Sequence, residues 1–240
     1  MPDQRKHRGP HPQDERLFGA PCVGRLRAAV SDLSWLLTRG YAMPSSLKIV
    51  GDRHALDQRQ RTAVMRAACS DAARHCRASH AVAAGDVAGR AILIDGYNVL
   101  TTIEAALAGG VLLACRDGTF RDMASLHGSF RKVEETRPAL TLIGQSLAGL
   151  RPAGCVFYLD SPVSNSGRLK TLMAQIAQDN AWNWDIRIVP SPDAVLASAD
   201  DIIATADSVI LDRCTRWFGL AAEVLQRHGI DANVIDLNVG

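Results

Sequence analysis

The sequence predicts an α/β protein in two parts: a small all-helical N-terminal region and a doubly wound parallel sheet of about five strands. Up to residue 80, apolar side chains recur at steps of three and four residues, as on one face of a helix. After Arg90, short continuous apolar runs alternate with helical patterns, which is typical of strands buried on both faces of a parallel sheet. The chain has 240 residues, 47% of them hydrophobic, which suffices for one large or two small cores.

Three segments are expected along the chain. Residues 1–22 are charged and proline-rich without periodicity, and this composition predicts a disordered tail. Residues 23–85 are expected to form a helical domain that carries an excess of basic residues. Residues 86–240 are expected to form the α/β domain, with residues 82–89 as the linker that leads into it.

Within the helical domain, three helices are expected. Gly40 is placed to end the first, and the turn at residues 43–46 starts a short second one. Asp57 and Gln60 have the spacing of a capping box, which begins a long alanine-rich helix that continues to about Ser79.

In the α/β domain, the apolar runs predict five strands, at residues 91–95, 155–160, 185–189, 201–207 and 233–236. Helical patterns lie between most of them, at residues 123–133, 140–150 and 169–176. This alternation predicts crossover connections and a parallel sheet with helices on both faces.

Several classes of protein are excluded by composition. The longest run without charge or strong polarity, residues 105–115, is too short to cross a bilayer, and the N-terminus lacks the apolar region of a secretory signal. The six cysteines form no C-x-x-C pair and are expected to be reduced thiols. We therefore expect a cytoplasmic protein without membrane contact.

Charge is unevenly distributed along the chain. Residues 1–80 contain 14 Lys and Arg against 7 Asp and Glu, a balance of +7, and residues 81–240 contain 13 against 18, a balance of −5. A basic front part suits contact with nucleic acid, and an acidic back part suits a metal site. Charged, solvated helix surfaces explain the same numbers, so both interpretations stay open.

Acidic residues follow the predicted strands with a positional regularity. Asp95, Asp160 and Asp207 each close a predicted strand, and Asp193 lies a few residues past another. The carboxyl ends of parallel strands face one crevice, so these acids are expected to converge there. Crowded carboxylates repel one another, and Mg²⁺ or Mn²⁺ relieves this because both ions prefer oxygen ligands. Capping of helices by single aspartates is the structural alternative.

Three segments of the α/β part resemble a known family. The segment IDGYNVL at residues 94–100 looks like the opening motif of NYN domains, a branch of the PIN-like nucleases. The segments YLDSPVSNSGRLKTLM and IIATADSVIL are similar to later strand–acid–helix elements of that family. The resemblance covers roughly residues 90–240. It implies a Rossmann-like PIN fold and Mg²⁺- or Mn²⁺-dependent hydrolysis of phosphodiester bonds in RNA.

Matched residue by residue, the resemblance implies a site made of Asp95, Asn98, Asp160 and Asp207, with the three aspartates as metal ligands. Asn98 would orient a water or a phosphate. The segment at residues 115–122 departs from the family pattern, and the acid expected from an intervening helix is left open. The acids whose role stays open are Glu104, Asp117, Asp122, Asp201 and Asp212.

Basic and polar residues near these acids are candidates for substrate binding. Arg116, Arg121, His127 and Arg131 cluster in the sequence around a predicted turn, after which Thr119 is expected to cap a helix with Asp122 at its third position. A second group, Ser164, Asn165 and Arg168, begins the helix after Asp160, where free backbone N–H groups attract anions.

The N-terminal part carries a resemblance of its own. The segment LLTRGYAMPSSLKIVGDRHALDQRQRTAV is similar to a small domain of uncharacterised bacterial and archaeal proteins, often attached to a PIN-like half. This resemblance spans about residues 25–75 and implies no activity.

The sequence thus predicts a metal-dependent ribonuclease with nucleic acid as its partner. A non-catalytic RNA- or nucleotide-binding protein on the same fold is the main alternative. A phosphatase is a further one, although Asp95 is followed by Gly-Tyr and not by a D-x-D-x-T motif. A helical region that binds a protein partner or a second copy of the chain is the last.

Overall fold

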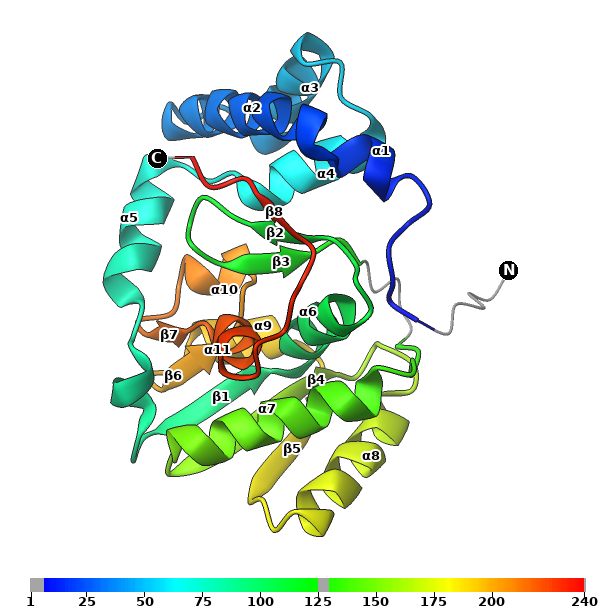
Figure 1. Cartoon of the computed structure of the whole chain (residues 1–240). Coiled ribbons are helices and arrows are strands. Elements are labelled where there is room, and N and C mark those ends of the chain that lie inside the picture. The colour runs from blue at the N-terminus through cyan, green and yellow to red at the C-terminus, as the bar shows by residue number, and fades with distance from the viewer. Residues whose placement is uncertain (1–6, 125–129, 240) are drawn as a thin grey trace.

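The main sheet of the computed structural model has five parallel strands in the order β5-β4-β1-β6-β7 (Figure 1). The structure describes residues 7–124 and 130–239. The strands are β1 (Ala91–Asp95), β4 (Gly154–Asp160), β5 (Trp184–Val189), β6 (Ile202–Ala204) and β7 (Trp217–Phe218). The predicted α/β class is confirmed, and four of these strands overlap the predicted apolar runs.

Helices cover both faces of this sheet. On one face lie α6 (Gly96–Leu107), α7 (Thr136–Leu150), α8 (Ser166–Asp179) and α11 (Leu220–Arg227), and on the other α9 (Pro192–Ala197) and α10 (Ser208–Leu211). The central strand β1 shows why its sequence is continuously apolar. Ile92 and Ile94 pack against the helices on the face of α6, whereas Leu93 between them packs against α9 and α10 on the other face. A polar residue at any of these three positions would be buried without a partner.

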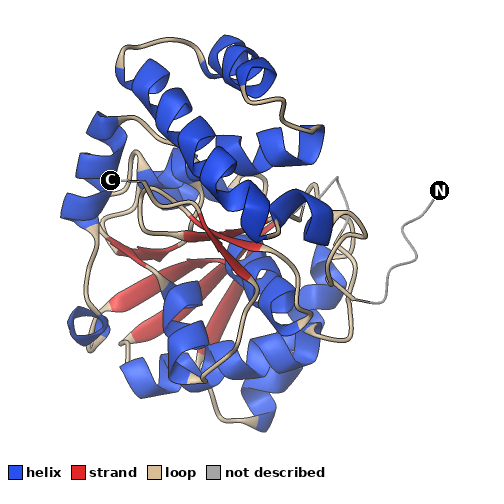
Figure 2. Cartoon of the chain, turned by 45° about the horizontal axis from the view of Figure 1, so that its top comes forward, coloured by secondary structure: helices blue, strands red, loops and turns tan. Residues whose placement is uncertain are grey.

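A second sheet of three strands lies between the main sheet and the N-terminal helices (Figure 2). It consists of β2 (Leu112–Ala114), β3 (Phe120–Asp122) and β8 (Val234–Asp236), in the order β3-β2-β8. The fifth predicted strand therefore belongs to this sheet, and β7 takes the fifth place in the main one. In β8 only Ile235 is buried, between two exposed residues, so this strand has one covered face instead of two.

The predicted helix start at Thr119 is wrong, because β2 and β3 form a hairpin there. The carboxylate of Asp117 accepts hydrogen bonds from the backbone N–H of Thr119 at 3.2 Å and from its hydroxyl at 2.7 Å, and Gly118 between them has a φ of +81°. These contacts stabilise a turn and not a helix cap. Met123 and Val133 lie outside any helix, so the predicted helix over residues 123–133 does not form where the structure describes the chain.

From residue 7, where the described part of the chain begins, five helices precede the α/β part: α1 (Asp14–Phe18), α2 (Ala20–Thr38), α3 (Met43–Arg53), α4 (Gln58–Ala67) and α5 (Asp71–His80). A short 3₁₀ helix, η1 (Ala84–Val87), follows in the predicted linker. Residues 14–22 are helical apart from Gly19, in contrast to the tail expected over residues 1–22, since Leu17 and Phe18 are buried. The long helix expected up to Ser79 is divided because Ser70 caps α5, accepting a bond from the N–H of Ala73 at 3.1 Å.

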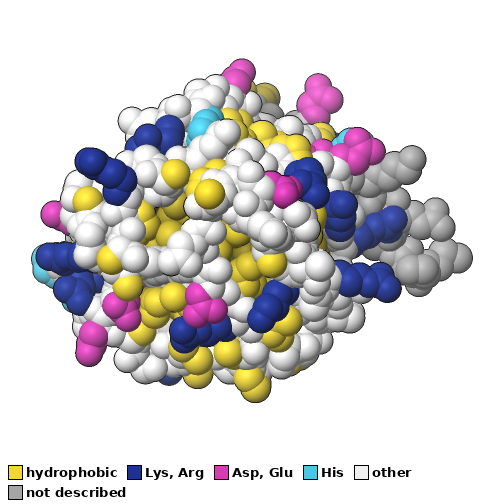
Figure 3. Space-filling model, turned by 90° about the horizontal axis from the view of Figure 1, so that it is seen from below, with side chains coloured by type: hydrophobic (Ala, Val, Ile, Leu, Met, Phe, Trp, Pro, Cys, Tyr) yellow, Lys and Arg dark blue, Asp and Glu magenta, His cyan; other side chains and the backbone are white. Residues whose placement is uncertain are grey.

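The N-terminal helices and the small sheet share one apolar cluster. Leu26 and Leu33 of α2 and Val64 of α4 are fully buried in it, together with Leu113 of β2 and Leu237 beyond β8. The face of the molecule turned away from these helices is seen in Figure 3, where apolar side chains gather in the middle and acidic ones are spread singly. None of the helices found in residues 7–124 and 130–239 has the length and apolar content that crossing a bilayer requires.

A glycine in α7 permits a close contact with an aromatic ring. A methyl group built at Gly144 overlaps the ring of Trp182, so we expect Gly144→Ala to destabilise the protein by about 1–3 kcal/mol. Gly24 of α2 is the matched control, because a methyl group there meets nothing within 4 Å. Gly24→Ala is expected to stabilise the protein by about 0.5–1 kcal/mol. Urea unfolding of both variants checks this pair, and equal effects would contradict it.

Candidate functional site

Four aspartates lie along the carboxyl edge of the main sheet. Asp95 is the last residue of β1, Asp160 is the last of β4, Asp193 lies in α9 just after β5, and Asp207 follows β6. The chain leaves β1 toward β4 on one side, while β6 pairs with β1 on the other side. The carboxyl ends of β1 and β6 therefore form the switch point of the sheet, which is where open α/β folds bind their ligands.

The charges of these carboxylates act on one another. Desolvation and, to a smaller extent, the negative charges of Asp207 and Asp193 raise the pKa of Asp95 to about 7, against the lowering effect of the bonds from Thr205 and from the N–H of Asn98. The pKa of Asp160 is raised by desolvation and by the charge of Asp193. The pKa of Asp193 is raised by desolvation and by the charge of Asp207. The arrangement thus holds acids together at a cost in electrostatic energy.

Hydrogen bonds join the segment after β6 to β1 and α6. The Thr205 hydroxyl donates to Oδ2 of Asp95 at 2.9 Å, and the N–H of Ala206 donates to Oδ1 of Asn98 at 2.8 Å. Asp95 also accepts the N–H of Asn98 at 3.3 Å as the N-cap of α6. Asp207 caps α10 by accepting the N–H groups of Val209 and Ile210. Asp95 and Asp207 therefore cap helices and also belong to the row of acids at this edge.

Gly96 makes the close approach of α6 to β4 possible. A methyl group at this position would lie 2.9 Å from the carbonyl oxygen of Tyr158, too close for any side chain. The first turn of α6, which carries Asn98, can therefore start directly above the sheet only because residue 96 is glycine.

The chemistry of these side chains suits Mg²⁺ or Mn²⁺, since carboxylate oxygens are the preferred ligands. The sequence predicts that Asp95, Asp160 and Asp207 hold a metal together, and their carboxylates lie less close to one another than this requires. Among the described residues, no three His, Cys, Asp or Glu side chains lie close enough to hold one ion together. Mg²⁺ is commonly held by one or two carboxylates, with waters and substrate phosphates as its other ligands. Asp95 and Asp207, whose charges act on one another, have the ligand chemistry that an ion of that kind prefers.

A cavity of about 830 Å³ opens beside this edge, between the N-terminal helices and the α/β part. Asn98 and Asp207 line it from the sheet edge, together with Thr101, Thr102 and Asp122. Asp122 accepts the hydroxyls of Thr101 and Thr102 at 3.2 and 3.1 Å. Of the four aspartates along the sheet edge, Asp207 lines the cavity and lies within reach of a ligand of substantial size.

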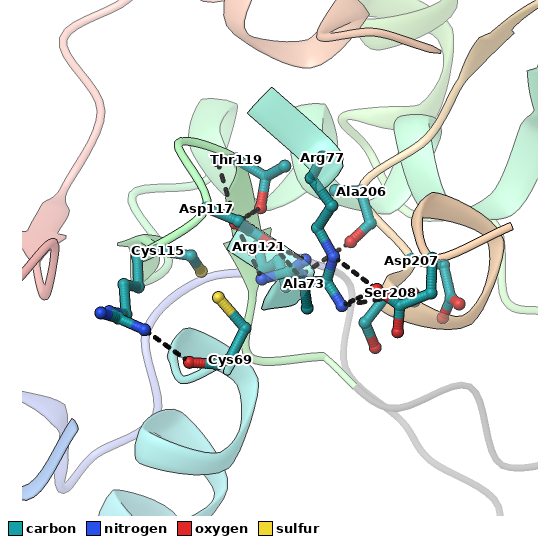
Figure 4. Close-up of polar contacts among 12 residues, drawn as sticks. Cys69, Ala73, Arg77, Cys115, Asp117, Thr119, Arg121, Ala206, Asp207 and Ser208 are labelled. Carbon is teal, nitrogen blue, oxygen red and sulfur yellow. Dashed lines mark hydrogen bonds and ion pairs between the residues drawn. The ribbon is translucent and has the colours of Figure 1, made fainter. Parts of the chain in front are cut away.

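Two of the predicted substrate-binding arginines are buried and hold the protein together. Arg121 donates to both carboxylate oxygens of Asp117, to the carbonyl of Arg66 and, at 2.7 Å, to that of Ala206. Arg116 donates to the carbonyl of Cys69 and to the carboxylate of Asp71. Both guanidinium groups are therefore engaged by protein partners, and their contact with a phosphate stays a prediction. Arg121 does line the cavity, and it fixes the backbone just before Asp207 (Figure 4).

The remaining predicted substrate-binding residues lie away from the cavity lining. Arg131 and Arg168 are exposed, and the carbonyl of Ser164 accepts the N–H of Phe130 at 3.0 Å. The Asn165 side chain donates to the carbonyl of Phe130 at 3.1 Å, so these residues form one neighbourhood at the start of α8. His127 lies outside the described residues.

The other acids have distinct places. Glu104 is fully buried and paired with Arg8 and with the Thr136 hydroxyl. Asp117 and Asp212 both bond to Arg77 of α5, at 2.5 and 2.7 Å. Asp201 is exposed at the amino end of β6, and so at the opposite edge from Asp207.

Sequence reasoning missed two residues that shape the site. The Thr205 hydroxyl donates to Asp95 and accepts the N–H of Asp207. The second bond could have been expected from the sequence, since a threonine hydroxyl often bonds to the backbone two residues along. Arg77 is 3% exposed and reaches from α5 to the carbonyl of Ser208, the first residue of α10, and to Asp212, its C-cap. A buried arginine on a polar helix gives no signal in the sequence, because its partners are distant along the chain.

Comparison with known proteins gives two family matches. A family model described as a domain of unknown function, DUF5616, matches residues 84–223, and one described as a protein of unknown function, DUF434, matches residues 25–79. A protein of Methanocaldococcus jannaschii, Uncharacterized protein MJ0935, is 30% identical over 144 residues. That match covers 60% of this chain and 69% of the relative. No solved structure matches significantly. The expected likeness of the helical part to a domain of uncharacterised proteins is confirmed.

Proposed function

The chain belongs to the DUF5616 family, whose description gives no function, and from the geometry of its site we propose that it is a Mg²⁺- or Mn²⁺-dependent hydrolase of phosphodiester bonds in RNA. The observation that carries the proposal is the set of acids along one sheet edge. Asp95, Asp160, Asp193 and Asp207 follow four parallel strands, and desolvation together with the charges of neighbouring aspartates raises the pKa of Asp95, Asp160 and Asp193. A divalent cation at this edge removes the repulsion, so the apo arrangement favours its binding.

Within this proposal, each side chain has a stated role. Asp95 and Asp207 hold the cation, and Asp160 and Asp193 add negative charge around it. Asn98 lines the cavity, where its amide N–H donors suit a phosphate oxygen. The cation, when bound, lowers the pKa of a water ligand and offsets charge on the leaving oxygen. Thr205 and Arg121 keep Asp95 and the Ala206 backbone in place.

A second candidate is a protein that binds RNA or a nucleotide without cleaving it. One observation favours it: the described residues contain no compact set of three metal-ligating side chains. A phosphate bound with a single loosely held cation would need no more than the Asp95 and Asp207 pair. The two candidates share the site and differ only in turnover.

Turnover is tested with the full-length protein and a labelled single-stranded RNA. We expect cleavage in Mg²⁺ or Mn²⁺ and none in EDTA. Asp207→Asn is expected to slow cleavage by about 10²–10⁴-fold. Asp201→Asn is the matched control and should cleave at the wild-type rate, because Asp201 lies at the opposite edge of the sheet. RNA binding without cleavage in either metal would favour the second candidate.

A further inference from the structure

The cavity beside the acids has two walls of different chemistry. The wall from the α/β part is polar and includes Asn98, Thr101, Asp122, Asp207 and Ser208. The wall from the N-terminal helices includes the apolar side chains of Leu37, Met43, Met65, Ala68 and Ala73, beside Arg66 and Arg77, whose guanidinium groups donate to the α/β part. A ligand that fills this space must therefore carry a polar, charged part and an apolar part.

The apolar wall is open to solvent at one methionine. Met65 of α4 is 39% exposed, although it lines a concave space, while Leu37 and Met43 are partly buried against the core below. An apolar side chain left exposed in a cavity gains free energy when a ligand covers it. A thioether is polarizable and adapts its shape, and it makes favourable contacts with flat aromatic rings.

From these two walls we propose that the helical part binds a nucleobase, with the phosphate of the same nucleotide at Asp207. The inference rests on the proposed function, because it takes the acid edge as the site of the phosphate and its cation. A nucleotide has an anionic end and a flat, largely apolar end, which matches the two walls in order. The volume of about 830 Å³ lies within the range of small-molecule sites and accommodates a mononucleotide.

In this assignment the helical part contacts the ligand directly, a role that does not depend on its excess of basic residues. It supplies one wall of the site, in which apolar side chains lie beside two arginines, Arg66 and Arg77, that are already bonded to the α/β part. Because an apolar wall contacts any base face, we expect little discrimination among the four bases and a preference for purines, which have the larger face. Contact with the base then fixes which phosphate lies at the acids.

The test compares two ligands that differ by the base alone. Adenosine 5′-monophosphate and ribose 5-phosphate are titrated into the full-length protein in Mg²⁺ by calorimetry; neither contains a phosphodiester, so no cleavage interferes. The nucleotide is expected to bind at least tenfold more tightly. Met65→Ala should reduce that ratio three- to fivefold. Ile49→Ala is the matched control, because Ile49 is 61% exposed on the neighbouring helix and does not line the cavity.

Equal affinity for the two ligands, or no binding of either, would overturn the base site. The same follows if Met65→Ala and Ile49→Ala change the ratio alike. The cleavage assay separates this inference from the proposed function. If the nucleotide binds more tightly than ribose 5-phosphate but the protein cleaves no RNA, the base site is supported and the hydrolase proposal is contradicted. If the protein cleaves RNA but binds the two ligands equally, the hydrolase proposal is supported and the base site is contradicted.

Discussion

Asp95→Asn is expected to unfold less readily than the wild type at pH 8 and to match it near pH 4. The pKa of Asp95 is raised to about 7 in the folded protein, mainly by desolvation, against an ordinary value of 3.8. Below pH 3.8 both states hold the proton and the group has no effect. Between pH 3.8 and 7 the unfolded state loses its proton while the folded state keeps it, so stability falls as the pH rises and the loss is complete above pH 7. We expect a difference of about 2–4 kcal/mol in the free energy of unfolding at pH 8.

Urea unfolding of both proteins across this pH range measures that difference, with Asp201→Asn as the control. The same pair tests the cation. Mg²⁺ or Mn²⁺ should raise the melting temperature of the wild type and leave that of Asp95→Asn unchanged, since a ligand that binds only the folded form stabilises it. An equal increase in both proteins would remove Asp95 from the cation site.

Arg77→Met is expected to destabilise the protein by about 3–5 kcal/mol. Arg77 donates to Asp117 at 2.5 Å and to Asp212 at 2.7 and 2.8 Å, and its removal leaves the fully buried Asp117 with Arg121 as its remaining guanidinium partner. Burial alone raises the pKa of Asp117, but Arg121 and Arg77 outweigh it and hold the pKa at about 2. The stabilisation is present above pH 3.8 and is lost as the pH falls toward 2.

The midpoint of acid unfolding should therefore move to higher pH in Arg77→Met. Arg74→Met, one turn earlier on α5, is the control and should cost less than about 1 kcal/mol, because Arg74 is only half-buried. Since Arg77 also holds the carbonyl of Ser208, the variant should bind Mg²⁺ more weakly at neutral pH. Equal stability of the two variants would show that the ion pairs at Arg77 add nothing.

The sheet and its acids were predictable because both depend on local sequence. Buried parallel strands such as β1 must be apolar on both faces, and an aspartate at the strand end is visible beside them. The hairpin of β2 and β3 was not predictable in this way. Its strands have three residues each, and the spacing from Thr119 to Asp122 is common to a helix cap and to this turn.

The arginines show a second limit. Arg116 and Arg121 follow one another closely in the sequence and resemble a binding patch, yet their partners come from α4, from the segment before α5 and from the segment after β6. Charge is visible in a sequence, but burial depends on segments far apart. The same holds for the cavity wall at Met65, which looks like one more apolar position on an amphipathic helix until the opposite wall is known.

The apolar cluster shared by the N-terminal helices and the small sheet sets an order on folding during synthesis. Leu26 and Leu33 emerge from the ribosome early, but the cluster that buries them closes only when Ile235 and Leu237 arrive. Arg27 illustrates the span, since it donates to the carbonyl of Asp236, 209 residues away. Contacts of such long range form slowly. We therefore expect the helices α1 to α4 to pack on one another first and the face that meets the small sheet to be covered last, when β8 is made.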